Sequence, residues 1–342
     1  MASMSAMLRT RLAHNDEQVA TLESQVAALE SRIALLRRDR QIPHDQLAAI
    51  VYPILTLPDD VTSSIFLQYA DEYPTRKCSP IVLASVCTQW HAVALTTTGL
   101  WTRFSSERFY SSGSQRCVQL PDLLRMWLSR SGALPLDLRI ELPWTIRSRE
   151  AIMGLSLEYS SRWGSVQLGN FSPHELQGGP RAFPFLTDLV LSSKEPGPVA
   201  SIPSLLDAPR LRSVELSGPT FIDHGSLPSL PWRQLTNLNI SVADPGECLQ
   251  ILEQTQMLEV LGFTLTANWD EQVTFPAPRV IILRHVHTLR LSRQTTQFIF
   301  RHLTLPALRQ LDMKHAMVDS APEVAALMQR SRCPVMKPAL AD

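Results

Sequence analysis

Apolar residues follow three different patterns along the chain, and each pattern predicts a different kind of element. Between residues 12 and 36 they recur at alternating steps of three and four, the heptad spacing of a helix with one narrow apolar seam. Between residues 53 and 104 they gather at helical spacings that polar turns interrupt, which predicts a small helical unit. From residue 131 onward, short alternating runs return about every 25 residues, which predicts repeated strands.

The heptad segment predicts one helix over residues 12–36, and we expect Pro43 to close it because proline does not continue a helix. Most a positions carry β-branched residues and most d positions carry leucine, a choice typical of parallel two-stranded coiled coils. The seam consists of Leu12, Val19, Val26 and Ile33 at a, with Asn15, Leu22, Leu29 and Leu36 at d.

Charges beside this seam weigh against pairing of two copies. In a parallel pair, Arg32 at a g position would face Arg37 at an e position of the other copy and repel it, while only Arg11 and Asp16 would attract. We therefore expect self-association through residues 12–36 to be possible but not favoured. The favoured alternative is a helix that packs on its own chain.

The helical unit begins with a helix-start signal. Pro58 suits the first helical position, where its missing N–H needs no partner, and Asp59 and Asp60 suit the first turn of the helix dipole. After a polar stretch, a second helical pattern runs from Leu83 to Ala94. The pattern predicts a compact set of helices with many large apolar groups for its size.

The large residues of this unit resemble the F-box motif. The matching residues are Leu57 and Pro58 with Asp60, then Ile65 and Phe66, then Val86 and Cys87 with Trp90, and finally Leu100 and Trp101. The resemblance implies that these residues, together with Val61, dock on a Skp-type adaptor and through it on a cullin of an SCF-type ubiquitin ligase. The alternative is an ordinary helical core in which the same side chains only pack against one another.

The third pattern reads L-x-x-L-x-L and resembles leucine-rich repeats. Its copies are Leu186-Leu189-Leu191, Leu211-Val214-Leu216, Leu235-Leu238-Ile240, Leu258-Leu261-Phe263, Val286-Leu289-Leu291 and Leu308-Leu311-Met313, with weaker forms at Leu136-Leu138-Ile140 and Val166-Leu168. Helix-start signals in the returning segments stand at 244–247 and 320–323. The alternative is a doubly wound α/β domain, which favours longer apolar strands and a glycine-rich phosphate loop that the sequence lacks.

These patterns together predict an α+β multidomain fold. We expect a long N-terminal helix over residues 1–42, a small three-helix F-box over 43–104, a helical linker over 105–130 and an irregular α/β leucine-rich-repeat solenoid over 131–342.

The polar positions between the repeat leucines are the candidate target-binding residues. Because side chains alternate along a strand, these positions point away from the leucines, toward the concave side of a solenoid. The candidates are Glu215, Asn237, Asn239, Arg290 and Asp312. The alternative is a face that is merely solvated. The aromatic residues Trp232, Phe263 and Trp269 form a second candidate group, although core or rim packing explains them better.

Composition narrows the classes of function. The 342 residues are 44% apolar and carry 32 basic against 32 acidic side chains, so we expect no nucleic-acid partner. No apolar run is long enough for a membrane span or resembles a secretory signal, so we expect no membrane partner. Five scattered cysteines favour a reducing compartment, the cytoplasm or the nucleus.

No motif predicts catalysis. Nucleotide-binding and nucleophile motifs are missing, and His285, His287, His302 and His315 lack further ligands at metal-site spacing. We therefore expect no enzyme activity, no cofactor and no metal. The resemblance implies a substrate-recognition subunit of an SCF-type ubiquitin ligase, whose repeats bind a protein substrate. The alternative is a scaffold outside any ligase that uses the coiled coil and the repeats.

Overall fold

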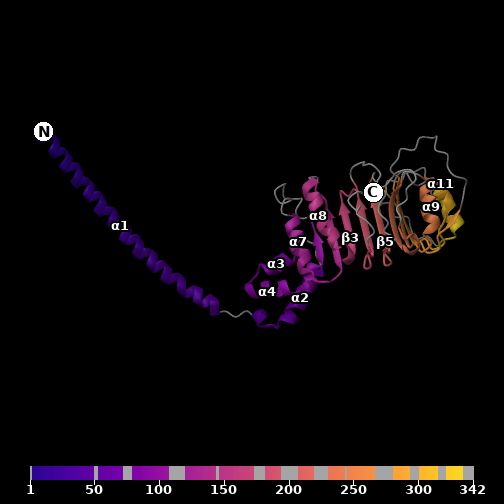
Figure 1. Cartoon of the computed structure of the whole chain (residues 1–342), viewed down its shortest axis with the longest axis horizontal. Helices are drawn as coiled ribbons and strands as arrows, with labels where there is room; N and C mark the ends of the chain where they lie inside the picture. The colour runs from indigo at the N-terminus through magenta and orange to yellow at the C-terminus, as the bar shows by residue number, and fades with distance from the viewer. Residues whose placement is uncertain are drawn as a thin grey trace. The chain divides into compact units, whose positions relative to one another are not determined.

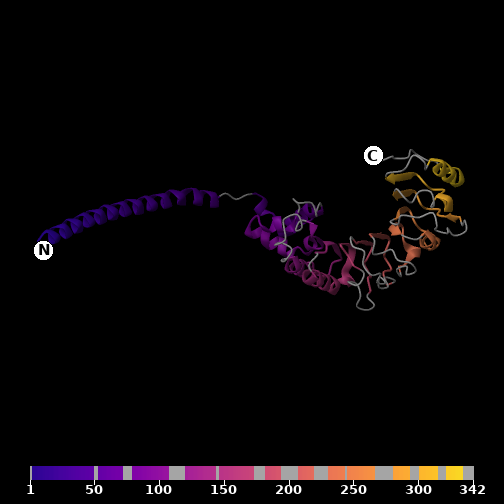
Figure 2. The same cartoon turned by 90° about the horizontal axis from the view of Figure 1, so that it is seen from above.

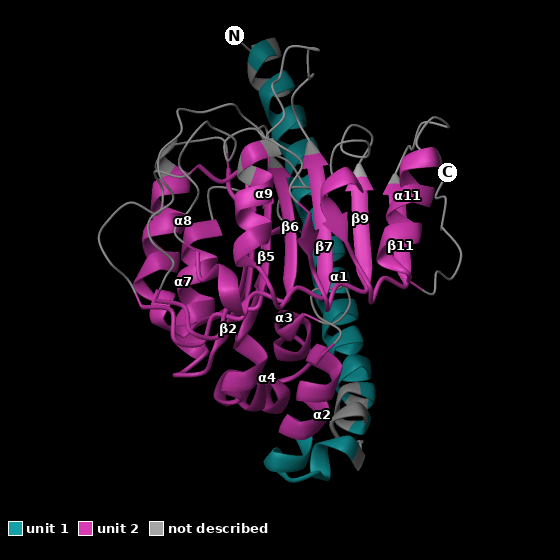
Figure 3. Cartoon of the chain, turned by 90° about the vertical axis from the view of Figure 1, so that its right-hand side faces the viewer, with its two compact units in different colours: residues 1–62 teal, residues 63–342 magenta. Residues whose placement is uncertain are grey.

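The computed structural model describes residues 2–49, 53–71, 79–107, 120–143, 146–172, 182–193, 207–218, 230–242, 245–265, 280–292, 300–314 and 321–333. The chain divides into two compact units, residues 1–62 and residues 63–342 (Figure 3). The boundary falls inside helix α2 (Asp59–Asp71), within the segment that resembles the F-box.

Unit 1 consists of the long helix α1 (Ala2–Ala49), the short helix η1 (Pro53–Thr56) and the first residues of α2. The prediction that Pro43 ends the first helix is wrong, because α1 continues through it. Proline removes one backbone hydrogen bond and frees the carbonyl four residues earlier. That residue, Asp39, is exposed, so water can bind the freed carbonyl and the helix can continue.

Unit 2 begins with a helical layer, which we define as residues 63–101. It contains the rest of α2, then α3 (Pro80–Ala84), α4 (Thr88–Thr96) and η2 (Thr98–Trp101). The single helical pattern expected from Leu83 to Ala94 is broken in the structure. The break occurs because Cys87 is extended, with φ −157° and ψ 170°, and its Sγ accepts a hydrogen bond from the Trp90 N–H at 3.5 Å. Cys87 thereby starts α4 as an N-cap.

The rest of unit 2 is built on a nine-stranded sheet whose neighbouring strands all pair in parallel. Its strands lie in chain order and are β1 (Arg103–Ser105), β2 (Leu136–Glu141), β3 (Trp163–Gly169), β4 (Asp188–Ser192), β5 (Ser213–Ser217), β6 (Asn237–Val242), β7 (Val260–Leu265), β9 (Thr288–Ser292) and β11 (Gln310–Lys314). A second, two-stranded sheet pairs β8 (Ile281–Ile282) with β10 (Leu303–Thr304). The order of the strands along the chain is visible in Figure 1.

The strands expected from the repeated leucines are confirmed, and their centres fall in one register. Successive pairings join Leu189, Val214, Leu238, Leu261, Leu289 and Leu311 in a single row across the sheet. The residues two positions later form a second row from Leu191 to Met313. Both rows are buried, so each strand contributes two side chains to one continuous core.

Helices cover the face of the sheet to which the leucine rows point. They are α7 (Leu120–Arg130), α8 (Ile146–Glu158), α9 (Pro245–Gln254) and α11 (Ala321–Ser331), with short helices η3 (Ser160–Arg162) and η6 (Trp232–Gln234). Figure 2 shows the four α-helices along the outer side of a curved sheet. The two helices expected from start signals near residues 244 and 320 are α9 and α11, and both are confirmed. Among the described helices of unit 2, none covers the opposite face.

Candidate functional site

The structure sorts the motif residues by exposure. In unit 1, Pro58, Asp60 and Val61 are exposed and Leu57 is half-buried. In unit 2, Ile65 and Val86 are exposed by 41% and 57%, Cys87 and Trp90 are half-buried, and Phe66, Leu100 and Trp101 are buried. The motif therefore divides into side chains that build the helical layer and side chains that face solvent.

Trp101 belongs to the first group. Its indole N–H donates to the Ala94 carbonyl at 2.8 Å, and its ring packs edge to face on Trp127 with centroids 4.9 Å apart. The Arg130 guanidinium lies 4.8 Å from the centre of the same ring. With 1% of its surface exposed, Trp101 joins the helical layer to α7 and has no face left for a partner. Phe66 and Leu100 are likewise buried, so these three predicted contact residues lie in the core of unit 2.

A second aromatic pair fixes α2 against α4. The rings of Phe66 and Trp90 pack edge to face with centroids 4.9 Å apart, a geometry that the ring quadrupoles favour. The His91 Nδ1 lies 2.9 Å from the Ala84 carbonyl and ties α4 to the end of α3. These contacts hold Ile65, beside Phe66 in sequence, in a position where its side chain faces water.

Exposed large apolar side chains are frequent in this layer. They are Ile65, Leu67, Ile81, Val82 and Val86, and we call them the exposed apolar residues of the helical layer. Single exposed apolar side chains are ordinary, but several on one small helical unit are typical of an interaction surface. The layer thus has a rigid aromatic core and an outer set of branched side chains suited to a protein partner.

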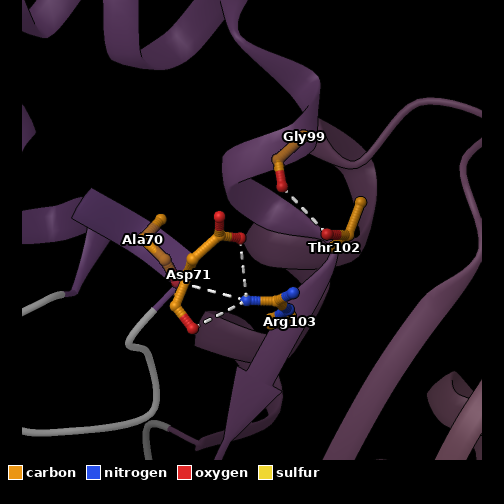
Figure 4. Close-up of polar contacts among 5 residues, drawn as sticks. All are labelled: Ala70, Asp71, Gly99, Thr102 and Arg103. Carbon is orange, nitrogen blue, oxygen red and sulfur yellow. Dashed lines mark hydrogen bonds and ion pairs between the residues drawn. The ribbon is translucent and has the colours of Figure 1, made fainter. Parts of the chain in front are cut away.

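Arg103 connects the layer to the sheet (Figure 4). Its Nη1 donates to the backbone carbonyls of Asp71 at 3.1 Å and Ala70 at 3.5 Å, and it pairs with the Asp71 carboxylate at 3.3 Å. A cation at these carbonyls also complements the negative end of the α2 dipole. Because Arg103 begins β1, it anchors the end of α2 directly to the first strand.

The open face of the sheet carries the candidate target-binding residues. Register pairings place Glu215 beside Asn239, Asn239 beside Gly262, Gly262 beside Arg290, and Arg290 beside Asp312. Asn237 lies two residues before Asn239 on the same face. The structure therefore brings all five predicted residues to one side of five neighbouring strands, β5, β6, β7, β9 and β11, with four of them in a single row.

Polar contacts order one end of this row. The Arg290 Nε lies 3.7 Å from the Asp312 carboxylate, and the Gln310 amide donates to both Asp312 oxygens at 3.0 Å. Gly262 leaves room for the Asn239 side chain, since a Cβ at Gly262 would lie 2.7 Å from the Asn239 Oδ1. Along the row the residues are an acid, an amide, a glycine, a base and an acid, which suits a polar peptide better than an apolar one.

The sequence missed a second charged group at the other end of the same face. Arg103, Asp137 and Arg139 lie on β1 and β2, and the Arg139 Nε is 3.8 Å from the Asp137 Oδ1. Burial raises the pKa of Asp137, the two arginines lower it, and Asp188 raises it again. The pattern Leu136-Leu138-Ile140 marks Asp137 and Arg139 as open-face positions, but nothing in sequence pairs them with Arg103.

The remaining candidates from the sequence, the aromatic group and the histidines, do not form a site among the described residues. Trp232 and Phe263 are buried in the core, and Trp269 and His315 lie outside the described residues. Among the described residues, no group of three or more His, Cys, Asp or Glu side chains is placed to hold a metal ion. Within the same residues, no helix is both long and apolar enough to cross a membrane. No family model, curated protein or solved structure matches the chain.

Proposed function

We propose that this chain is the substrate-recognition subunit of an SCF-type ubiquitin ligase. The observation that carries the proposal is the division of the F-box-like residues within one helical layer. Phe66 and Trp101 form its buried aromatic core, while Ile65 and Val86 stay exposed at motif positions. This is the arrangement that docking on a Skp-type adaptor requires: a stiff support and apolar side chains free to enter a partner.

The sheet supports the second half of the proposal, an irregular leucine-rich-repeat solenoid that binds a protein target. Strands in chain order, parallel pairing and aligned leucine rows are what stacked repeats produce, since each repeat covers the apolar edge of the one before it. A doubly wound sheet would reverse its strand order near the middle and place helices on both faces. The open polar face then presents Glu215, Arg290 and their neighbours to the target.

On this proposal the chain itself forms and breaks no covalent bonds. The helical layer holds the adaptor, the open face holds the target, and a ubiquitin-charged enzyme elsewhere in the complex supplies the reactive thioester. Ubiquitin transfer is accelerated by proximity, because binding holds a lysine of the target near the thioester and so raises its effective concentration there.

Adaptor binding by the purified full chain tests the proposal. Replacing Ile65 and Val86 together with Asp introduces two charges at exposed apolar positions, where the fold tolerates them and an apolar interface does not. Central apolar contacts often contribute about 2 kcal/mol or more each, so we expect binding to weaken by about a hundredfold or more. Biolayer interferometry on immobilised Skp-type adaptor measures the change.

The matched control replaces Ile282 and Val280, which are exposed by 49% and 55% in the β8 region, with Asp. It carries the same chemistry and charge outside the helical layer, so its binding should equal that of the wild-type chain. Absence of adaptor binding by the wild-type chain would overturn the ligase assignment and favour the scaffold alternative. Equal binding by both double variants would move the adaptor site away from Ile65 and Val86.

Target capture tests the open face separately. Charge reversal at Glu215, Arg290 and Asp312 changes side chains that are exposed or half-buried, so the melting temperature should stay near that of the wild-type chain. Affinity capture with proteasome inhibition, compared by mass spectrometry, should show loss of targets but retention of the adaptor. Unchanged target recovery would place the target site elsewhere on unit 2.

A further inference from the structure

The apolar seam of α1 is exposed along its whole described length. Ile33 is the most covered of its apolar members and still exposes 48% of its surface, while Leu12 exposes 66%. The exposed apolar members are Leu12, Val19, Leu22, Val26, Leu29, Ile33 and Leu36. The sequence favoured packing on the same chain over self-association, but the seam has the exposure of a surface that still needs a partner.

An apolar seam on a helix calls for a partner, because helical stability in proteins comes mainly from packing of the apolar face rather than from helix propensity. The seam is narrow, with one apolar residue at every third or fourth position, and spans roughly 38 Å at 1.5 Å per residue. A stripe this narrow and long fits another helix of the same spacing rather than a sheet or a pocket.

The polar member of the seam favours a parallel pair in register. In that arrangement Asn15 meets Asn15 of the second copy, and the two amides can hydrogen-bond to each other. In the antiparallel pair with full overlap, Asn15 would face Ile33 and leave its amide without such a partner. A single polar residue at an a position is known to fix register at a cost in stability, and Asn15 would place the same kind of amide pair at a d position.

Flanking charges favour the same orientation. With the seams fully overlapped and antiparallel, Arg9 would face Arg37, Asp16 would face Glu30 and Glu23 would face its own copy, so every charged e–e pair would repel. The g–g pairs of that arrangement would add one attraction, between Arg11 and Asp39, which does not offset the e–e repulsions. The parallel pair has one attractive and one repulsive charge pair on each side. We propose that α1 is an interface for a second copy of this chain and forms a parallel, in-register, two-stranded coiled coil through residues 12–36.

The proposal is independent of the adaptor site, and the full chain tests it. Sedimentation velocity at about 20 µM should give a species of twice 38.3 kDa, which dissociates on dilution by mass action. Replacing Val26 and Ile33 with Asp puts charges at two a positions and should leave a monomer. Replacing Ser24 and Ser31 with Asp puts the same charges on the opposite side of the helix and should leave the dimer intact.

Orientation is tested by Arg32→Glu. In the parallel pair this change converts two Arg32–Arg37 repulsions into attractions and should lower the dissociation constant about tenfold. In the antiparallel pair Arg32 faces Gln18, so the dissociation constant should not change. A monomeric wild-type chain at 20 µM, or a dimer that survives the Val26 and Ile33 double variant, would overturn the coiled coil. A dimer unaffected by Arg32→Glu would overturn its parallel orientation.

Discussion

The seam of α1 and the leucine rows of the sheet are equally regular in sequence, yet they lie in opposite environments. Each described apolar residue of the seam exposes about half of its surface or more, whereas Leu238, Leu261 and Leu289 expose 1% or less. The strand leucines are covered because the same pattern returns about 25 residues later in the same chain. Regular apolar spacing therefore shows that a face must be covered, and only the structure shows whether the chain covers it itself.

The strongest test of this comparison truncates one leucine from each set. Leu261→Ala leaves a cavity in a continuous core and should lower the free energy of unfolding by about 2–5 kcal/mol. Leu29→Ala removes a similar side chain from the α1 seam and should change the unfolding of unit 2 by less than about 0.5 kcal/mol. Urea titration followed by tryptophan fluorescence measures unit 2, since all seven tryptophans lie in its residues. Equal losses in the two variants would contradict the comparison.

Substitution of Gly218, the residue that follows β5, should give the next largest change in stability. Gly218 has φ +110°, and a Cβ there would lie 1.9 Å from the carbonyl oxygen of Ser193, which follows the neighbouring strand β4. Gly218→Ala should destabilise unit 2 by about 1–3 kcal/mol, because backbone strain adds to the clash.

The matched control for this position is Gly154 in α8, where an added Cβ meets nothing within 4 Å among the described residues. Gly154→Ala should raise the stability of unit 2 by up to about 1 kcal/mol, because alanine is the better helix former. If both substitutions shift the urea midpoint in the same direction, the close contact between Gly218 and the Ser193 backbone is not the reason that position 218 requires glycine.

The anchor between the helical layer and the sheet should give a smaller effect. Arg103→Met keeps the apolar stem but loses the hydrogen bonds to Ala70 and Asp71, which should cost about 1 kcal/mol after allowance for solvent exposure. Arg125→Met breaks an exposed ion pair with Asp122 and should cost less than about 0.5 kcal/mol. Differential scanning fluorimetry ranks the two, and a larger loss at Arg125 would contradict the anchoring role.

The smallest predicted effect is a pH dependence at Asp137. Burial raises the pKa of Asp137 above its ordinary value of 3.8, so the fold disfavours the charged form. The cost is present above the folded-state pKa and disappears as the pH falls below 3.8. Asp137→Asn should therefore be more stable than the wild-type chain at pH 7, and the advantage should shrink as acid is added. An advantage that grows toward low pH would contradict this assignment.

The sequence predicts best where the pattern repeats. Strands β2 to β7, β9 and β11 follow from the leucine spacing, and α9 and α11 follow from their start signals. The short strands β1, β8 and β10 could not be predicted, because two or three residues carry no period. The break before α4 depends on the extended backbone and cap of Cys87, and the continuation of α1 through Pro43 depends on solvent around one carbonyl.

The candidate site residues show the same limit of sequence-based prediction. Alternation along the strands was enough to gather Glu215, Asn239, Arg290 and Asp312 on one face. It was not enough to find Arg103, whose partners Ala70 and Asp71 are more than thirty residues away and are brought close only by the fold. Within the F-box-like motif, type and spacing could not distinguish buried Trp101 from exposed Val86, because both are large and apolar and only tertiary packing separates them.

Hydrogen–deuterium exchange of the full chain with and without a purified Skp-type adaptor tests the central claim most directly. We expect added protection of backbone amides in α2, α3, α4 and the turn between α3 and α4, where Ile65, Ile81, Val82 and Val86 are exposed, and unchanged exchange in β4 to β11. Such a result would show that the adaptor binds the helical layer and leaves the open face free for a target. Unchanged exchange throughout α2 to α4, or protection confined to the sheet, would contradict the proposed function.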